Sequence, residues 1–222
     1  MRSFDEIFAI SADRHGGADA LEAKLSPPKS PAALAAIPDD RWLAQMTRSV
    51  FQAGFNWKVV DAMWPGFEAA FKGFDIGTCA LMDDEWFDKL VTDTSIVRYP
   101  AKIMSVRDNA AFLSSLARIH GSGAKALAEW PSEDFAGLLA MLKKDGNRLG
   151  GSTGQYFLRF MERDSYILSR DVVGRLEAEG VIDKAPTSKK AMNAVQEAFN
   201  TWMDQSGRSL TEISRVLAMS TG

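Results

Sequence analysis

Apolar positions recur along most of the chain with the three- and four-residue spacing of amphipathic helices. The spacing is clear in Trp42-Leu43-Met46-Val50, in Phe67-Ala70-Phe71-Phe74 and in Phe135-Leu138-Leu139-Leu142. Because residues three and four apart share one helical face, each group predicts a helix with a buried stripe. No segment shows the sustained apolar–polar alternation with β-branched residues that is typical of strands. The pattern therefore predicts an all-α protein.

Boundary signals support this prediction. Asp83-Asp84-Glu85 and Pro131-Ser132-Glu133-Asp134 place acids where helices would begin, and acids in a first turn interact favourably with the helix dipole. Thr187-Ser188-Lys189-Lys190 opens an amphipathic helix that buries Ala194, Val195, Phe199 and Trp202. Ser209-Leu210-Thr211-Glu212 has the arrangement of a capping box. The proline-rich segment from Leu25 to Pro38 predicts an irregular connection.

Length and composition limit the architecture. A chain of 222 residues with 46% hydrophobic content is long enough to bury a good core. We expect one domain over residues 1–222, built as two helical lobes around a cleft. Its parts would be an N-terminal segment (1–40), a core (41–176) and C-terminal helices (177–222).

Cysteine usage and charge bear on location and partners. The lone Cys79 forms no internal disulfide, and no signal peptide or apolar run of about 20 residues is visible, so we expect a cytoplasmic monomer without a membrane partner. The formal net charge of −3 counts against indiscriminate nucleic-acid binding. A local basic face is still expected around residues 143–163, from Lys143, Lys144, Arg148, Arg159 and Arg163.

The most informative stretch is the glycine-rich Leu149-Gly150-Gly151-Ser152-Thr153-Gly154. A hairpin of this kind between two helices turns backbone N–H groups outward, where they can hold a phosphate at a helix N-terminus. Gly151, Ser152, Thr153 and Gly154 are therefore candidate phosphate-binding residues. Asp171 follows twenty residues after Gly151, at the start of the next predicted helix. Together they suggest a protein that grips a nucleic-acid backbone and does chemistry beside it.

A second informative stretch is Gln52-Ala53-Gly54-Phe55-Asn56-Trp57. A glycine within a helix costs about 1 kcal/mol relative to alanine, so Gly54, on a predicted helix or helix end, suggests close packing or backbone approach. Trp57 and Phe55 would form an aromatic wall on which a base could stack for about 1–3 kcal/mol. The alternative is that both aromatic side chains belong to the core.

These motifs resemble those of the 3-methyladenine DNA glycosylase I family. In that family a motif of the form QAGLSW precedes a helix that ends in FD, as Gln52–Trp57 precedes Phe74-Asp75 here. Ile96-Val97-Arg98-Tyr99-Pro100-Ala101-Lys102-Ile103 and Asp108-Asn109-Ala110 follow at similar spacings. The resemblance covers residues 40–112 and resumes over 148–176, where the family has its helix–hairpin–helix.

The resemblance implies a helix–hairpin–helix DNA glycosylase fold and a function in base excision repair. Such enzymes flip a damaged base out of double-stranded DNA, at a cost of a few kcal/mol, and hydrolyse its N-glycosidic bond. The expected substrate is an alkylated purine such as 3-methyladenine. Trp57 would stack on the base, and Ser49, Gln52 and Asn56 would line the pocket. No lysine matches the position used by bifunctional relatives, so no strand cleavage is expected.

The chain also departs from the family. Ser49 stands where the family has a pocket glutamate. The family ties its ends with a zinc site of two cysteines and two histidines, whereas the segment Arg170-Asp171-Val172-Val173-Gly174-Arg175 has Asp171 and Arg175 in place of two ligands. Structural zinc sites seldom use carboxylates, so we predict no metal and no cofactor.

Asp171 is the candidate catalytic residue. In the wider superfamily a catalytic aspartate lies about 20 residues after the hairpin, where it stabilises developing positive charge on the sugar or orients water. Alternatively, Asp171 caps its helix or pairs with Arg170 or Arg175. A function of a different class is also open: the chain could be a catalytically silent helix–hairpin–helix module that binds DNA or a partner. The absence of the pocket glutamate agrees with this alternative.

Overall fold

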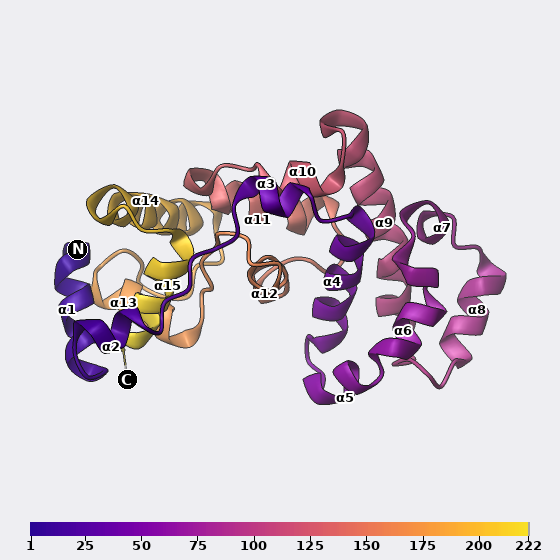
Figure 1. The fold of residues 1–222 in the computed structure, drawn as a ribbon, viewed down its shortest axis with the longest axis horizontal. Helices are drawn as coiled ribbons and strands as arrows, with labels where there is room; N and C mark the ends of the chain where they lie inside the picture. Colours follow the sequence, from indigo (N-terminus) through magenta and orange to yellow (C-terminus); the bar gives the residue numbers. More distant parts are fainter. Residues whose placement is uncertain (222) are drawn as a thin grey trace. The chain divides into compact units, whose positions relative to one another are not determined.

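The computed structural model describes residues 1–221, and over that range it consists of helices joined by turns and loops, which confirms the all-α prediction. In chain order the elements are α1 (Phe4–Arg14), α2 (Ala18–Glu22), α3 (Pro31–Ala35), α4 (Asp39–Gln52), α5 (Trp57–Ala62), α6 (Trp64–Ala70), the 3-10 helix η1 (Lys72–Phe74), α7 (Ile76–Ala80), α8 (Asp84–Thr92), α9 (Pro100–His120), α10 (Gly123–Ala128), the 3-10 helix η2 (Ser132–Asp134), α11 (Phe135–Asp145), α12 (Ser152–Phe160), α13 (Arg170–Ala178), α14 (Lys189–Ser206) and α15 (Leu210–Met219) (Figure 1).

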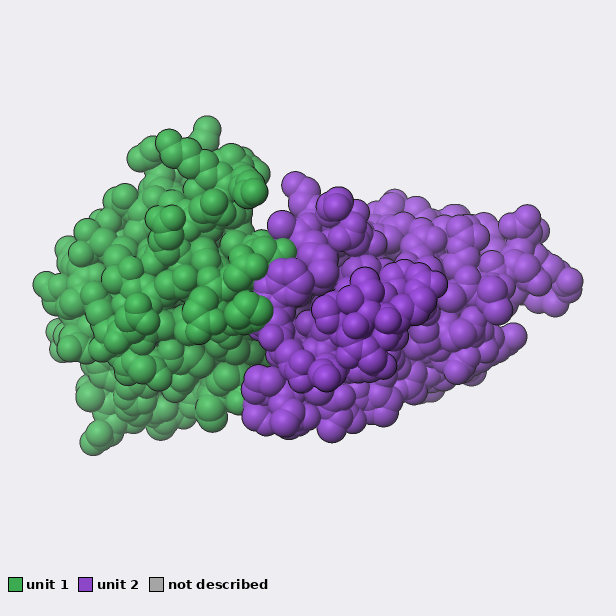
Figure 2. Space-filling view, turned by 90° about the horizontal axis from the view of Figure 1, so that it is seen from above, with its two compact units in different colours: residues 1–29, 131–137, 162–222 green, residues 30–130, 138–161 purple. Residues whose placement is uncertain are grey.

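The helices form two compact units, which Figure 2 shows in different colours. Unit 1 is assembled from residues 1–29, residues 131–137 and the chain from Glu162 onward. Unit 2 contains residues 30–130 and 138–161. Unit 1 thus joins the two ends of the chain, whereas most of unit 2 is one continuous stretch.

Unit 2 is built around α9, against which α4, α7, α8 and α10 pack. The face of α4 that the periodicity predicts is buried, including Trp42, Leu43, Met46 and Val50. The ring of Trp42 meets Phe157 of α12 edge to face, with centroids 5.8 Å apart. This contact fixes the glycine-rich segment before α12 relative to α4.

Unit 1 is held by α15, which contacts α1, α13 and α14. Val195, Phe199 and Trp202 of α14 are buried as predicted, whereas Ala194 is only half-buried. The Phe199 ring stacks on Tyr166 with centroids 4.5 Å apart. The capping box at Ser209 is also present, since its hydroxyl accepts from the N–H of Glu212 and the Glu212 carboxylate accepts from the N–H of Ser209.

Two local predictions were wrong. The segment from Leu25 to Pro38 is not irregular throughout, because it contains α3; Ser30 caps this helix and Pro31 supplies its first residue with a suitable φ. Gly54 does not mark close packing, since a Cβ atom added there would meet no atom within 4 Å. Its backbone has a φ of +68°, which glycine adopts without the steric strain that a Cβ atom brings.

Candidate functional site

Ser49 and Gln52 lie one turn apart at the end of α4, and each is only 5% exposed. Ser49 Oγ accepts a hydrogen bond of 3.3 Å from Gln45 Nε2. Gln52 Nε2 donates to Asp61 Oδ1 at 3.0 Å, while its Oε1 has no hydrogen-bond partner among the described residues. A buried carbonyl oxygen without a partner is uncommon and is a candidate acceptor for a ligand.

Trp57 begins α5 and is 43% exposed, so it is not a core residue. Asn56 caps this helix, because its Oδ1 accepts from the N–H of Lys58 at 3.0 Å. Phe55 is exposed as well. The alternative that both aromatic side chains belong to the core is therefore excluded for this segment.

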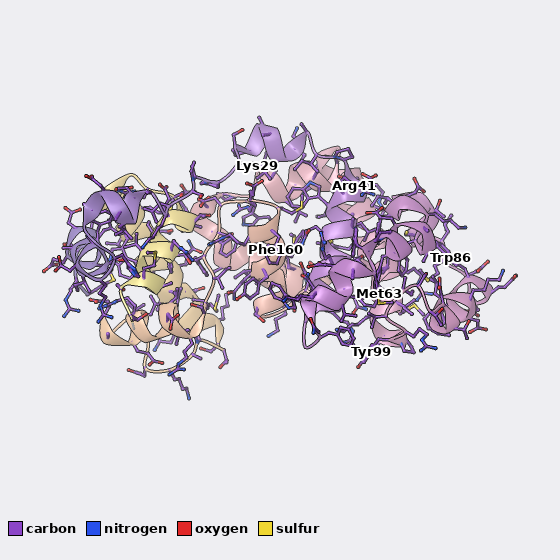
Figure 3. All side chains as sticks on the ribbon, turned by 60° about the horizontal axis from the view of Figure 1, so that its bottom comes forward. Lys29, Arg41, Met63, Trp86, Tyr99 and Phe160 are labelled. Carbon is purple, nitrogen blue, oxygen red and sulfur yellow. The ribbon has the colours of Figure 1, made fainter. Side chains whose placement is uncertain are left out.

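The Trp57 ring is part of an aromatic cluster with Tyr156 and Phe160 of α12. Its centroid lies 5.7 Å from that of Tyr156 and 5.6 Å from that of Phe160, both in edge-to-face geometry. Phe160, labelled in Figure 3, is also exposed. Tyr156 and Phe160 are not among the site residues predicted from the sequence. The available signal was their four-residue spacing, which places both on one face of a helix.

The glycine-rich segment lies between α11 and α12 and belongs to unit 2. Gly151 is the N-cap of α12 with a φ of +61°, and Gly151 and Ser152 are exposed. Thr153 is half-buried. Gly154 is buried, and a Cβ atom there would lie 2.3 Å from the carbonyl oxygen of Leu149, so only glycine fits.

Asn109 of α9 fixes the loop that leads into this segment. Its side-chain Oδ1 accepts from the N–H of Asn147 at 2.8 Å, and its Nδ2 donates to the carbonyl oxygen of Asn147 at 3.1 Å. The Asn147 side chain in turn donates to Asp108 Oδ2 at 2.6 Å. The Asp108-Asn109-Ala110 motif thus holds the glycine-rich hairpin, a role that sequence reasoning did not assign.

Asp171 belongs to unit 1, whereas the other candidate residues belong to unit 2. It is an exposed residue in the first turn of α13. Ser169 caps that helix by accepting from the N–H of Val172 at 3.2 Å, so Asp171 is not the cap. Among the described residues, no side chain pairs with its carboxylate, and its backbone carbonyl accepts from Thr221 Oγ1. Of the described residues, neither Arg170 nor Arg175 therefore pairs with Asp171, and Asp171 does not cap α13.

Arg175 takes part in a buried cluster instead of pairing with Asp171. Its Nη1 lies 3.3 Å from Glu179 Oε1, and its Nε and Nη2 donate to the hydroxyl and carbonyl oxygens of Ser220. Arg2 Nη1 reaches the same Glu179 oxygen at 2.8 Å. Burial alone would raise the pKa of Glu179, but the hydrogen bonds from Arg2 and Arg175 lower it overall.

The residues around Arg175 do not fit a zinc ion. A guanidinium is always protonated and cannot act as a ligand. The ring nitrogen Nε2 of His15 is occupied by a 3.0 Å contact with the carbonyl oxygen of Met219. Over residues 1–221, no three histidine, cysteine, aspartate or glutamate side chains gather in a group suited to a metal ion.

The predicted basic face is only partly present. Lys143, Lys144 and Arg148 are exposed on or beside the hairpin. Arg163, however, is only 2% exposed, donates to the carbonyl oxygen of Asp164 and lies over the ring of Phe135. Its inclusion in the basic face was wrong, because it is enclosed in unit 1.

Comparisons with known proteins agree with the sequence motifs. Residues 35–135 match the model of a family described as Methyladenine glycosylase. A solved structure of 3-methyladenine DNA glycosylase I is 21% identical and covers 65% of this chain and 85% of its own, with a TM-score of 0.48. The Staphylococcus aureus enzyme is also 21% identical, with coverages of 68% and 89% and a TM-score of 0.47. No curated protein matches the chain.

None of the helices in residues 1–221 is long and apolar enough to cross a membrane.

Proposed function

We propose that this chain, which over residues 35–135 belongs to the methyladenine glycosylase family, is a monofunctional DNA N-glycosylase. Its reaction would be hydrolysis of the N-glycosidic bond of an alkylated purine such as 3-methyladenine in double-stranded DNA. Water adds to the sugar carbon, the base leaves, and an abasic site remains. The observation that carries the proposal is the exposed ring of Trp57. It comes shortly after the buried residues Ser49 and Gln52 in the sequence, and all three lie in unit 2, which contains most of the family match.

Base recognition follows from the chemistry of this region. A base in duplex DNA is inaccessible until it is flipped out of the stack. Trp57 offers it a stacking surface, and an electron-rich ring favours a positively charged alkylated purine through cation–π attraction. Ser49, Gln52 and Asn56 line the pocket. The unpartnered Oε1 of Gln52 supplies a hydrogen-bond acceptor there.

Phosphate binding falls to the hairpin of Gly151, Ser152, Thr153 and Gly154. The exposed backbone before α12 and the positive end of the helix dipole both favour an anion. Such contacts hold the DNA in register without reading its sequence. Gly154 contributes by letting the chain pass close to Leu149.

Catalysis is assigned to Asp171. An ionised carboxylate stabilises positive charge that develops on the sugar as the base departs, or orients the attacking water. This assignment is supported by a carboxylate that neither caps α13 nor pairs with Arg175. We further propose that the enzyme acts as a cytoplasmic monomer and without a cofactor.

A catalytically silent DNA- or partner-binding module is the second candidate. Two observations favour it: Ser49 replaces an acidic side chain of the resembled family, and Asp171 is exposed. A DNA-binding module of this kind would keep the hairpin contacts while it releases no base.

Base release from methylated duplex DNA tests the proposal. The purified protein is incubated with the DNA, free bases are separated by chromatography, and Asp171→Asn is compared with Glu177→Gln. Glu177 is the matched control because it is an exposed acid on the same helix. We expect 3-methyladenine release by the natural protein and by Glu177→Gln, and its loss in Asp171→Asn.

Other outcomes separate the alternatives. Release that survives in Asp171→Asn would keep the glycosylase and remove Asp171 from its mechanism. Absence of release together with salt-sensitive DNA binding would favour the silent module.

A further inference from the structure

Tyr99, Lys102 and Arg148 form a basic–aromatic cluster in unit 2. Tyr99, which is labelled in Figure 3, directly precedes α9. Its side chain is 49% exposed. Lys102 Nζ lies 5.6 Å from the centroid of its ring, and Arg148 Cζ lies 5.7 Å from the same centroid. Two cations therefore flank one exposed aromatic ring.

Backbone carbonyl oxygens hold both cations in place. Lys102 Nζ donates to the carbonyl oxygens of Phe51 at 3.2 Å and Ala53 at 2.7 Å. Arg148 Nε donates to the carbonyl oxygen of Ala101 at 3.2 Å. Within the described chain, neither has a carboxylate within 4.0 Å, whereas Arg41, Arg48 and Arg208 all do. The positive charge of the cluster is therefore positioned but not neutralised.

Electrostatics and backbone conformation both indicate an arrangement suited to a ligand. Burial and the neighbouring charge of Arg148 lower the pKa of Lys102, so each cation makes the other less favourable. An anion between them would relieve this repulsion. Arg148 also has a φ of +61°, a strained conformation for a residue with a side chain, and such strain gathers at functional sites.

We propose that Lys102 and Arg148, which lie against the Tyr99 ring, bind a phosphodiester group of the DNA backbone. This site is distinct from the hairpin of Gly151–Gly154. Arg148 precedes Gly151 by three residues, so their Cα atoms are at most about 11 Å apart. Because one DNA strand carries a charge every 3.4 Å along the helix axis, both sites can engage phosphates of the same strand. The inference rests on the proposed function only in taking DNA as the partner.

The salt dependence of binding to undamaged duplex DNA tests this site. Each lost phosphate contact lowers the slope of log affinity against log salt by about 0.9. We expect that reduction in Arg148→Gly and in Lys102→Met, measured by fluorescence anisotropy. Tyr99→Leu removes no charge, so its slope is expected to stay that of the natural protein.

Two controls separate binding from folding. Glycine at a φ of +61° is unstrained, so Arg148→Gly is expected to unfold at the same or a higher temperature than the natural protein. Arg118→Gln is the matched arginine control, because Arg118 is exposed and lies about 24 Å further along α9 than Lys102. Its salt slope is expected to remain that of the natural protein.

The outcomes are distinct. Unchanged slopes in both Arg148→Gly and Lys102→Met would overturn the site. Inorganic phosphate that stabilises the natural protein more than Arg148→Gly, without any change in DNA slope, would assign the cluster to free phosphate and also overturn it. Because the DNA is undamaged, a lack of base release would count against the proposed function and leave this measurement intact.

Discussion

Two arginines, Arg175 in unit 1 and Arg148 in unit 2, are used in opposite ways. Arg175 is buried against Glu179 and Ser220, and through Glu179 it is connected to Arg2 near the start of the chain. Arg148 is exposed, and within residues 1–221 it is held by the carbonyl oxygen of Ala101 and the ring of Tyr99. A neutralised, buried cation stabilises a fold, whereas a positioned, unneutralised one is available to a ligand. We therefore assign Arg175 to stabilising the fold and Arg148 to binding a ligand.

The largest expected effect comes from breaking the buried cluster of unit 1. Glu179→Gln removes the charge shared by Arg2 and Arg175 while it keeps the side-chain volume. Removing one partner of a buried ion pair costs about 3–5 kcal/mol, because the other charge is left uncompensated. The measurement is the free energy of urea unfolding, with the exposed Glu177→Gln as control. Equal stabilities for the two variants would contradict the structural role of the cluster.

The same carboxylate predicts an acid-sensitive unit 1. The pKa of Glu179 is lower in the folded protein than its usual 4.5. A group with a lowered folded pKa stabilises the fold above its unfolded pKa and loses that contribution as the pH falls through the folded value. Stability is therefore expected to fall below about pH 4.5. Urea unfolding at several pH values would show a weaker decline in Glu179→Gln, and an identical decline would exclude Glu179 as a cause.

In unit 2 the largest expected effect is at Asn109. Asn109→Leu leaves the N–H and the carbonyl oxygen of Asn147 without their partners, which we expect to cost about 2–4 kcal/mol. Cys79 reports on this unit, since it is buried and burial raises its pKa to about 12. Native-state alkylation of Cys79 is expected to accelerate in Asn109→Leu. The control Asn193→Leu, an exposed position of α14 in unit 1, should leave the rate unchanged.

The helical pattern was predictable from sequence because burial on one face imposes the 3.6-residue period directly on the residues. The faces of α4 and α14 follow it. What could not be predicted depends on contacts between distant residues. The rings of Trp57 and Phe160 are in contact although more than one hundred residues separate them in the sequence. The guanidinium of Arg163 is buried over the ring of Phe135. Residue type alone gave no sign of either contact.

The exposed aromatic cluster offers a test of unit 2 as the recognition surface. Trp57→Leu removes a stacking surface that is worth about 1–3 kcal/mol per base, whereas its half-exposed ring contributes little to folding. We expect weaker binding of DNA that carries an abasic site or an alkylated base, with unfolding close to that of the natural protein. Trp86→Leu in α8 is the control, since its indole donates to the carbonyl oxygen of Ala70 and it lies outside the cluster.

The smallest expected effect on folding is at Ser49. Its hydroxyl accepts one long hydrogen bond from Gln45, so Ser49→Ala should change the free energy of unfolding by less than about 1 kcal/mol. If Ser49 lines the base pocket, the same change alters which alkylated bases are released, because a hydroxyl that can both donate and accept is lost beside the unpartnered Oε1 of Gln52. Chromatography of the bases released from methylated DNA measures this. An unchanged ratio of bases would place Ser49 outside the pocket, and the buried end of α4 would then serve the fold as Arg175 does.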